Sequence, residues 1–148
     1  MDRILHQRPM NYNSIITKLY FVLIYADGKV DDKEIASGNR MIKSEALGED
    51  EFKTQMEYLK SKDQTILFSE CLAGLKKLIR KQQVRIIAWL CVVANADGFM
   101  DRTEWQIIYK IYHKELNLPL DEIFRVQKEL NGLGPEKSSL LNGLKAVS

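Results

Sequence analysis

The sequence predicts an all-α fold: a helical bundle of about seven helices, built from two copies of a helix–acidic turn–helix unit. Three observations lead to this prediction. Apolar residues recur at helical spacing, and no segment alternates apolar and polar residues over the length of a strand. Only three prolines and eight glycines interrupt the 148 residues. One acidic motif also occurs twice, with Asp97 following Asp27 by 70 residues.

The first half of the chain shows four helical segments separated by turn and cap signals. A polar leader precedes an apolar stretch that starts at Ile15, and Gly28 ends this stretch. Asp31 and Asp63 stand where helix N-caps are expected, and Gly48 separates the second segment from the third. The expected helices cover about residues 15–26, 31–46, 49–60 and 63–79.

The second half repeats this organisation after a charged and polar segment, residues 80–83, where a break between the halves is expected. Helices are then expected over about residues 84–96, 101–116 and 119–131. The tail, residues 132–148, is apolar enough for a short packed helix. The whole chain, residues 1–148, is expected to form one domain, with repeat 1 over about residues 15–60 and repeat 2 over about residues 85–131.

The duplicated motif is an acidic turn that follows an apolar helix in each half. Five identities hold at the constant offset: Ala26 with Ala96, Asp27 with Asp97, Gly28 with Gly98, Asp31 with Asp101 and Glu34 with Glu104. The similarity continues beyond the turn, because Glu45 faces Glu115 and each copy runs into a helix carrying a phenylalanine, Phe52 or Phe124. Neither unit can bury its apolar face alone, so the two are expected to pack with their apolar helices near the centre.

These turns resemble the TerB-like domain, a family that includes a bacterial tellurite-resistance protein and the membrane-proximal segment of a J-domain co-chaperone. The resemblance covers roughly residues 15–130 and rests on two copies of Asp-Gly-x-x-Asp-x-x-Glu. The chain departs from the family pattern at Phe99, where such turns usually carry a polar residue, and in a long basic stretch between its halves. The resemblance implies an all-α fold, bacterial origin, a stress-linked accessory role, acidic residues as candidate ligands of a divalent cation, and no catalysis.

Most of each acidic turn has a structural interpretation that needs no ligand. The glycine supplies the positive φ with which a helix ends. The second aspartate, Asp31 or Asp101, caps the next helix, which is worth about 1 kcal/mol. The glutamate three residues later, Glu34 or Glu104, can reach back to the cap residue and complete a capping box.

The first aspartate of each turn, Asp27 or Asp97, is less well explained. It falls in the last turn of a helix, where the macrodipole disfavours a carboxylate. An Asx-turn, a bound cation or a basic residue of a partner protein could compensate. The cation hypothesis is a weak, hydrated Ca²⁺ or Mg²⁺ site unlike an EF-hand, because the loop is too short. Its candidate ligands are Asp27, Asp31, Glu34, Asp97, Asp101 and Glu104.

A basic stretch lies between the two units and consists of Lys76, Lys77, Arg80, Lys81 and Arg85. The simpler interpretation is the solvated face of a helix whose other face is apolar. The alternative is a peripheral module that docks through this stretch on an anionic membrane surface or on nucleic acid. No aromatic residues interleave with the cations and the net charge is only +2, so nucleic acid is the less favoured of these partners.

The remaining features predict a non-enzymatic protein that binds protein partners. The sequence contains no nucleophile elbow, phosphate-binding loop or zinc-protease motif, and its two histidines stand far apart. Cys71 and Cys91 lie in apolar helical patterns and are expected to be buried thiols, while Trp89 and Trp105 are expected in the core. No apolar run approaches the roughly 20 residues of a membrane span, and no signal-peptide pattern occurs. The expected location is the cytoplasm, at most peripheral to the inner membrane.

Overall fold

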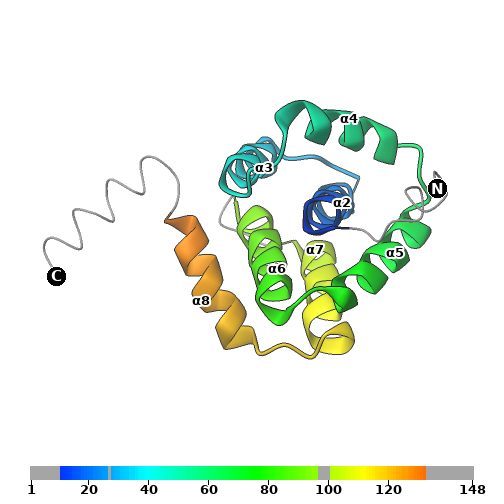
Figure 1. The fold of residues 1–148 in the computed structure, drawn as a ribbon. Helices are drawn as coiled ribbons and strands as arrows, with labels where there is room; N and C mark the ends of the chain where they lie inside the picture. Colours follow the sequence, from blue (N-terminus) through cyan, green and yellow to red (C-terminus); the bar gives the residue numbers. More distant parts are fainter. Residues whose placement is uncertain (1–10, 27, 97–100, 133–148) are drawn as a thin grey trace, which may run out of the picture.

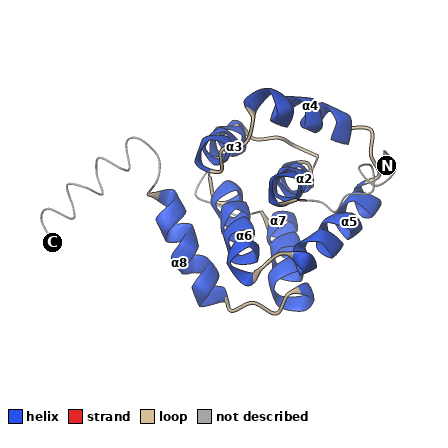
Figure 2. Cartoon of the chain, viewed as in Figure 1, coloured by secondary structure: helices blue, strands red, loops and turns tan. Residues whose placement is uncertain are grey.

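The computed structural model describes residues 11–26, 28–96 and 101–132. All regular structure in these ranges is helical, which confirms the predicted all-α class (Figure 2). The elements are α2 (Tyr12–Ile24), α3 (Asp32–Ser44), α4 (Glu49–Leu59), α5 (Gln64–Lys77), α6 (Arg80–Ala94), α7 (Arg102–Tyr109), the π-helix η1 (Lys110–Glu115) and α8 (Leu120–Asn131). None of these helices is both long and apolar enough to cross a membrane. The helix expected in the tail lies outside the described residues.

Helix α2 occupies the centre of the bundle and is viewed nearly end-on in Figure 1, where it packs against α4, α5 and α6. Helix α6 is the second central element, because it packs against α2, α3 and α8. Both helices are buried on most of their surface; Ile15, Leu23, Ile86 and Trp89, for example, are fully buried. The prediction that the two most apolar helices lie at the centre is therefore confirmed.

The start of α2 lies three residues earlier than the sequence predicts. Asn11 is the N-cap, and its side-chain oxygen accepts a hydrogen bond from the Ser14 N–H over 2.8 Å. This bond satisfies one of the free amides of the first turn, so the helix begins at Tyr12 although the apolar pattern begins only at Ile15.

The break between the two halves lies just before the predicted segment 80–83, so that prediction is wrong. Leu78 and Ile79 have extended backbone, with ψ angles of 158° and 156°, and α6 begins directly after them. The Gln83 side-chain amide donates to the Leu75 carbonyl over 2.7 Å. A polar residue expected in the break thus lies inside α6 and satisfies a carbonyl at the end of α5.

The helix predicted over residues 101–116 changes its hydrogen-bonding pattern at η1. The Leu116 N–H donates to the carbonyl of Ile111, five residues earlier, over 3.0 Å. A π turn of this kind holds one more residue than an α turn. One left-handed residue follows the corresponding helix in each half: Ala46 (φ 55°) in the first and Asn117 (φ 51°) in the second. These two residues are 71 positions apart, so the offset between the halves changes from 70 to 71 after η1.

The offset of 71 also pairs buried residues of α4 with buried residues of α8. Phe52 corresponds to Ile123, and Leu59 corresponds to Leu130. Phe52 and Phe124 do lie on helices of the two halves, as expected, but they are not equivalent positions, because the Phe124 side chain is 46% exposed. The descent of both halves from one duplicated unit stays a prediction.

Candidate functional site

The first acidic turn joins α2 to α3, and its described residues form a helix cap. Gly28 has a φ of 79°, in the left-handed region that favours glycine. Asp31 Oδ1 accepts the Lys33 N–H over 2.6 Å, and Glu34 Oε1 accepts the Asp31 N–H over 3.3 Å, which completes a capping box. The predicted capping roles of Asp31 and Glu34 are confirmed, whereas Asp27 lies outside the described residues.

A close contact between α2 and α3 holds this turn in place. The Tyr20 hydroxyl of α2 donates to the Glu34 carbonyl of α3 over 3.0 Å. One turn further along α3, Gly38 faces the same tyrosine, and a Cβ added there would lie 2.2 Å from the Tyr20 hydroxyl oxygen. The absence of a side chain at Gly38 therefore allows the approach of the two helices.

The second acidic turn, between α6 and α7, also has an aspartate as its N-cap. Asp101 Oδ2 accepts the Thr103 N–H over 2.8 Å, which confirms the predicted role of Asp101. Glu104 is buried at the third position of α7, which is the position that Glu34 holds in α3. Asp97 and Gly98 lie outside the described residues.

The cation hypothesis depends on the first aspartate of each turn. Within residues 11–26, 28–96 and 101–132, no group of three or more His, Cys, Asp or Glu side chains is arranged to hold a metal ion. Asp27 and Asp97 are not among these residues, so their contribution to such a site stays a prediction. Capping leaves the carboxylates of Asp31 and Asp101 with further acceptor capacity, since a carboxylate offers about four lone-pair sites.

The basic stretch is divided between the end of α5 and the first two turns of α6. Three of its five cations pair with carboxylates of other helices: Lys76 with Glu115 at 3.0 Å, Arg80 with Glu122 at 2.6 Å and Arg85 with Glu45 at 2.7 Å. Lys77 and Lys81 are exposed and form no ion pair with any described carboxylate. Most of the stretch therefore stabilises contacts between helices.

The pair of Arg85 and Glu45 joins α6 to the C-terminal end of α3. The Glu45 side chain is 3% exposed and accepts hydrogen bonds from Arg85 Nε at 2.8 Å and Nη2 at 2.7 Å. The hydroxyl groups of Tyr12 and Ser44 also donate to this carboxylate. Burial raises the pKa of Glu45, but the hydrogen bonds from Arg85 and Tyr12 outweigh burial, and the pKa lies below its ordinary value. The carboxyl group is therefore ionised at neutral pH.

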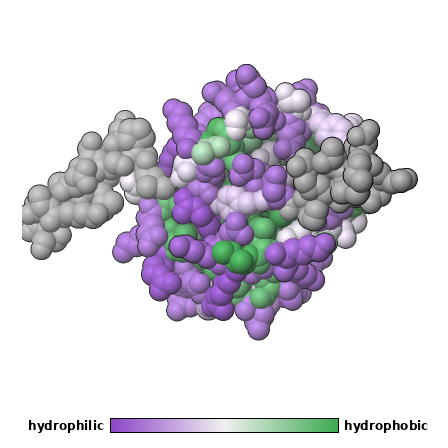
Figure 3. All heavy atoms as spheres, in the orientation of Figure 1, coloured by the Kyte–Doolittle hydropathy of each residue, from purple (hydrophilic) through white to green (hydrophobic). Residues whose placement is uncertain are grey.

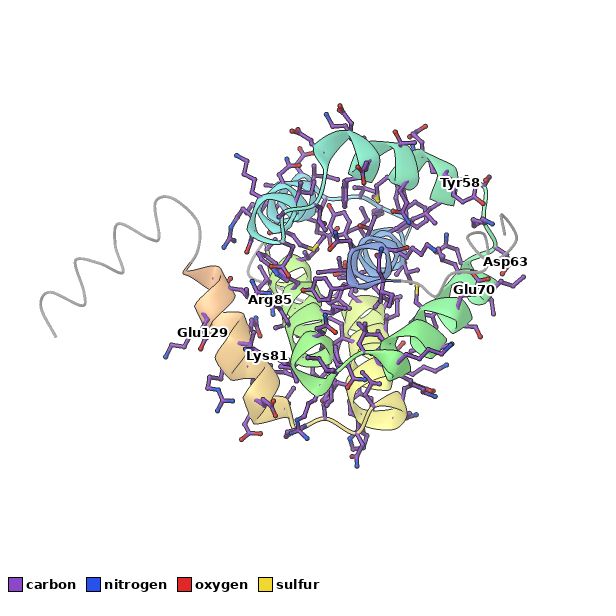
Figure 4. The ribbon with its side chains drawn as sticks, in the orientation of Figure 1. Tyr58, Asp63, Glu70, Lys81, Arg85 and Glu129 are labelled. Carbon is purple, nitrogen blue, oxygen red and sulfur yellow. The ribbon has the colours of Figure 1, made fainter. Side chains whose placement is uncertain are left out.

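A hollow of ≈ 400 Å³ opens to solvent beside this ion pair, and we call it the Arg85 pocket. Its lining consists of Tyr12, Ser44, Glu45, Lys81, Gln82 and Arg85. In Figure 4, Lys81 and Arg85 lie on the N-terminal part of α6. Of the lining residues, only Lys81 and Arg85 belong to the basic stretch that the sequence indicates as a candidate site. The sequence signal that could have identified Glu45 is its alignment with Glu115, because each of these acids pairs with a cation of the basic stretch.

The thiols and the tryptophans do not form a second site. Cys71 and Cys91 are buried and unpaired as expected, and burial raises the pKa of each thiol to about 12. Such thiols are protonated and unreactive at neutral pH. Trp89 is fully buried as predicted, whereas Trp105 is only half-buried and lies against Tyr112, with ring centroids 6.1 Å apart.

Comparison with known proteins identifies the family of the chain. The family model described as tellurite resistance protein TerB matches residues 14–127, which is more than half of the 148 residues. This range runs from the first turn of α2 to the middle of α8 and includes both acidic turns. No curated protein and no solved structure matches the chain. The chain therefore belongs to the TerB family, in agreement with the resemblance of its two acidic turns.

Proposed function

We propose that this chain is a non-catalytic TerB-family module that binds a protein partner in a stress-linked accessory role. The observation that carries the proposal is the family match over residues 14–127. The proposed location is the bacterial cytoplasm, at most at the surface of the inner membrane. Two buried free thiols, Cys71 and Cys91, support a reducing compartment.

The proposed partner surface lies where α6 and α8 begin. Ile79 is 66% exposed, and Phe124 is 46% exposed on α8. The ion pair of Arg80 and Glu122 links the first turns of the two helices. Figure 3 shows hydrophobic surface over the N-terminal end of α6, bordered by hydrophilic side chains. Apolar side chains beside an exposed charge pair are a typical composition of a protein-binding patch.

Replacing Ile79 and Phe124 together by serine is expected to abolish partner retention in a quantitative pull-down. The melting temperature should change little, because exposed side chains contribute within about 0.5 kcal/mol. Replacing Ile66 by serine is the matched control, since this side chain is 60% exposed on the first turn of α5. Equal retention by the double variant and the wild type would contradict the proposed surface.

The proposal includes a divalent cation, calcium or magnesium, at each acidic turn. Its ligands would be Asp27, Asp31 and Glu34 in the first turn and Asp97, Asp101 and Glu104 in the second. The sequence positions of Asp27 and Asp97 support this cation, because each follows an apolar helix whose C-terminal dipole disfavours a carboxylate. A cation would offset this cost and use the acceptor sites that the caps leave open.

A cation that binds only the folded state should raise the melting temperature by roughly 5–10 °C at a hundredfold excess over Kd. The Asp27→Asn and Asp97→Asn substitutions should remove this shift and leave the metal-free stability unchanged, because asparagine still forms an Asx-turn. Asp63→Asn is the control: Asp63 caps α5 through the Ile66 N–H at 3.0 Å, outside both turns, and its variant should keep the shift. Thermal melts that do not respond to calcium, magnesium or manganese would reject the cation.

The alternative, docking of the basic stretch on an anionic membrane or on nucleic acid, has less support. Lys76, Arg80 and Arg85 are bound to carboxylates of other helices. Lys77 and Lys81 are the two cations of the stretch that no described carboxylate neutralises, and two such charges provide a weak electrostatic attraction to phosphate groups.

A further inference from the structure

The Arg85 pocket contains one cation whose charge no described residue balances. Arg85 is neutralised by Glu45, which it binds through Nε and Nη2. Lys81, on the same lining, forms no ion pair with a described carboxylate. The pocket therefore carries a net charge of one positive unit.

The position of Lys81 in its helix makes this charge unfavourable. Lys81 is the second residue of α6, where the positive end of the macrodipole repels a cation, and the first turn contains no acidic residue. Arg80, its neighbour, is compensated by Glu122. Lys77 lies in the last turn of α5, where the macrodipole favours a cation. Within the described structure, Lys81 is therefore the cation of the basic stretch whose charge is balanced neither by a carboxylate nor by a helix dipole.

The pocket also holds unused hydrogen-bond donors near Lys81. None of the hydrogen bonds from Arg85 to Glu45 uses Nη1, so this group can donate to a ligand. The Gln82 side-chain amide, also on the lining, has two N–H groups. The volume of ≈ 400 Å³ is within the range of small-ligand sites.

We propose that the Arg85 pocket binds a carboxylate group through Lys81, with Arg85 and Gln82 as further donors. A monoanion matches the single net charge of the pocket. A phosphate monoester carries about −1.5 to −2 charges, and the excess would be repelled by the nearby Glu45 carboxylate. The site goes beyond the proposed function, because it requires neither the cation of the acidic turns nor the partner surface around Ile79.

The test is a titration of the full chain with sodium acetate, and separately with a short blocked peptide containing one glutamate, followed by NMR at constant ionic strength. Both probes should produce saturable shifts of the Gln82 side-chain amide and the Arg85 Nε–H. Lys81→Gln should weaken binding at least tenfold, and Lys81→Arg should keep it. Lys77→Gln is the matched control and should bind like the wild type, because Lys77 is an exposed, unpaired lysine outside the pocket lining.

Three results would overturn the proposal: shifts that do not saturate, equal weakening by Lys81→Gln and Lys77→Gln, or saturation by inorganic phosphate at lower concentration than acetate. The two probes also distinguish the source of the carboxylate. Tighter binding of the peptide assigns it to an acidic protein segment, and tighter binding of acetate assigns it to a free organic acid. Both outcomes support the site.

Discussion

Replacing Arg85 by methionine is expected to lower the free energy of unfolding by about 3 kcal/mol. The substitution keeps most of the aliphatic stem but leaves the Glu45 carboxylate, 3% exposed, without its cation. Removal of one partner from a buried ion pair is costly because the remaining charge has lost both water and its counter-ion. Arg85 itself is 39% exposed, which places the loss at the lower end of the range for such pairs. Thermal or urea denaturation measures it, with a fall in melting temperature of roughly 10 °C.

Arg80→Met is the matched control for this substitution. The Arg80–Glu122 pair has nearly the same separation, 2.6 Å against 2.7 Å, but the Arg80 side chain is 60% exposed. Its loss should lower the stability much less than the loss of Arg85, since exposed ion pairs contribute little. Equal losses for the two variants would show that burial of the Glu45 carboxylate is not the determining factor.

The stability of the wild type should also depend on pH through Glu45. The pKa of this carboxyl group in the folded state is lowered from its ordinary value of 4.5. Its contribution is therefore fully present above pH 4.5 and is lost as the pH falls through the folded-state pKa. The difference in stability between the wild type and Arg85→Met should narrow below pH 4.5, because protonation removes the charge that Arg85 neutralises.

Replacing Gly38 by alanine is expected to destabilise the fold by about 2 kcal/mol, although alanine favours helix by about 1 kcal/mol over glycine. The new Cβ would lie 2.2 Å from the Tyr20 hydroxyl oxygen and 2.4 Å from its Cζ. Tyr20 cannot move away easily, because it is buried, donates to the Glu34 carbonyl and packs on Phe52 with ring centroids 5.7 Å apart. Helices α2 and α3 must therefore separate.

Two further substitutions check this explanation by chemical denaturation. Gly48→Ala should cost less than about 1 kcal/mol, because the atoms nearest to its Cβ belong to the exposed Glu51 side chain, the first at 3.2 Å. In a Tyr20→Leu background, which lacks the distal ring atoms, the cost of Gly38→Ala should largely disappear. A Gly38→Ala protein as stable as the wild type would refute the close contact.

The caps and the central helices could be predicted because their determinants are local. Asp31, Glu34, Asp101 and Asp63 act within three residues of their own position, so the spacing of residue types is sufficient evidence. The burial of α2 and α6 could likewise be predicted from composition alone, because both segments are apolar on nearly every side. The same local signals carried the resemblance to the TerB family, which the family match over residues 14–127 confirms.

The helix break and η1 could not be predicted, because neither has a local signal. The chain bends at Leu78 and Ile79, two apolar residues, whereas the polar Gln83 that suggested a break lies inside α6. The π turn adds one residue without glycine or proline, so the sequence did not show that Phe52 corresponds to Ile123 at an offset of 71.

The sequence by itself determined the helical class, the two central helices and the helix caps of the acidic turns. Only the tertiary structure decided what the basic stretch contacts. Arg85 and Glu45 are 40 residues apart, and their hydrogen bonds exist because α6 packs against α3. A charge pattern within one helix records which residues are cationic, but the carboxylate that each cation meets depends on the packing of separate helices. The Arg85 pocket, which three helices form together, could therefore be found only in the folded chain.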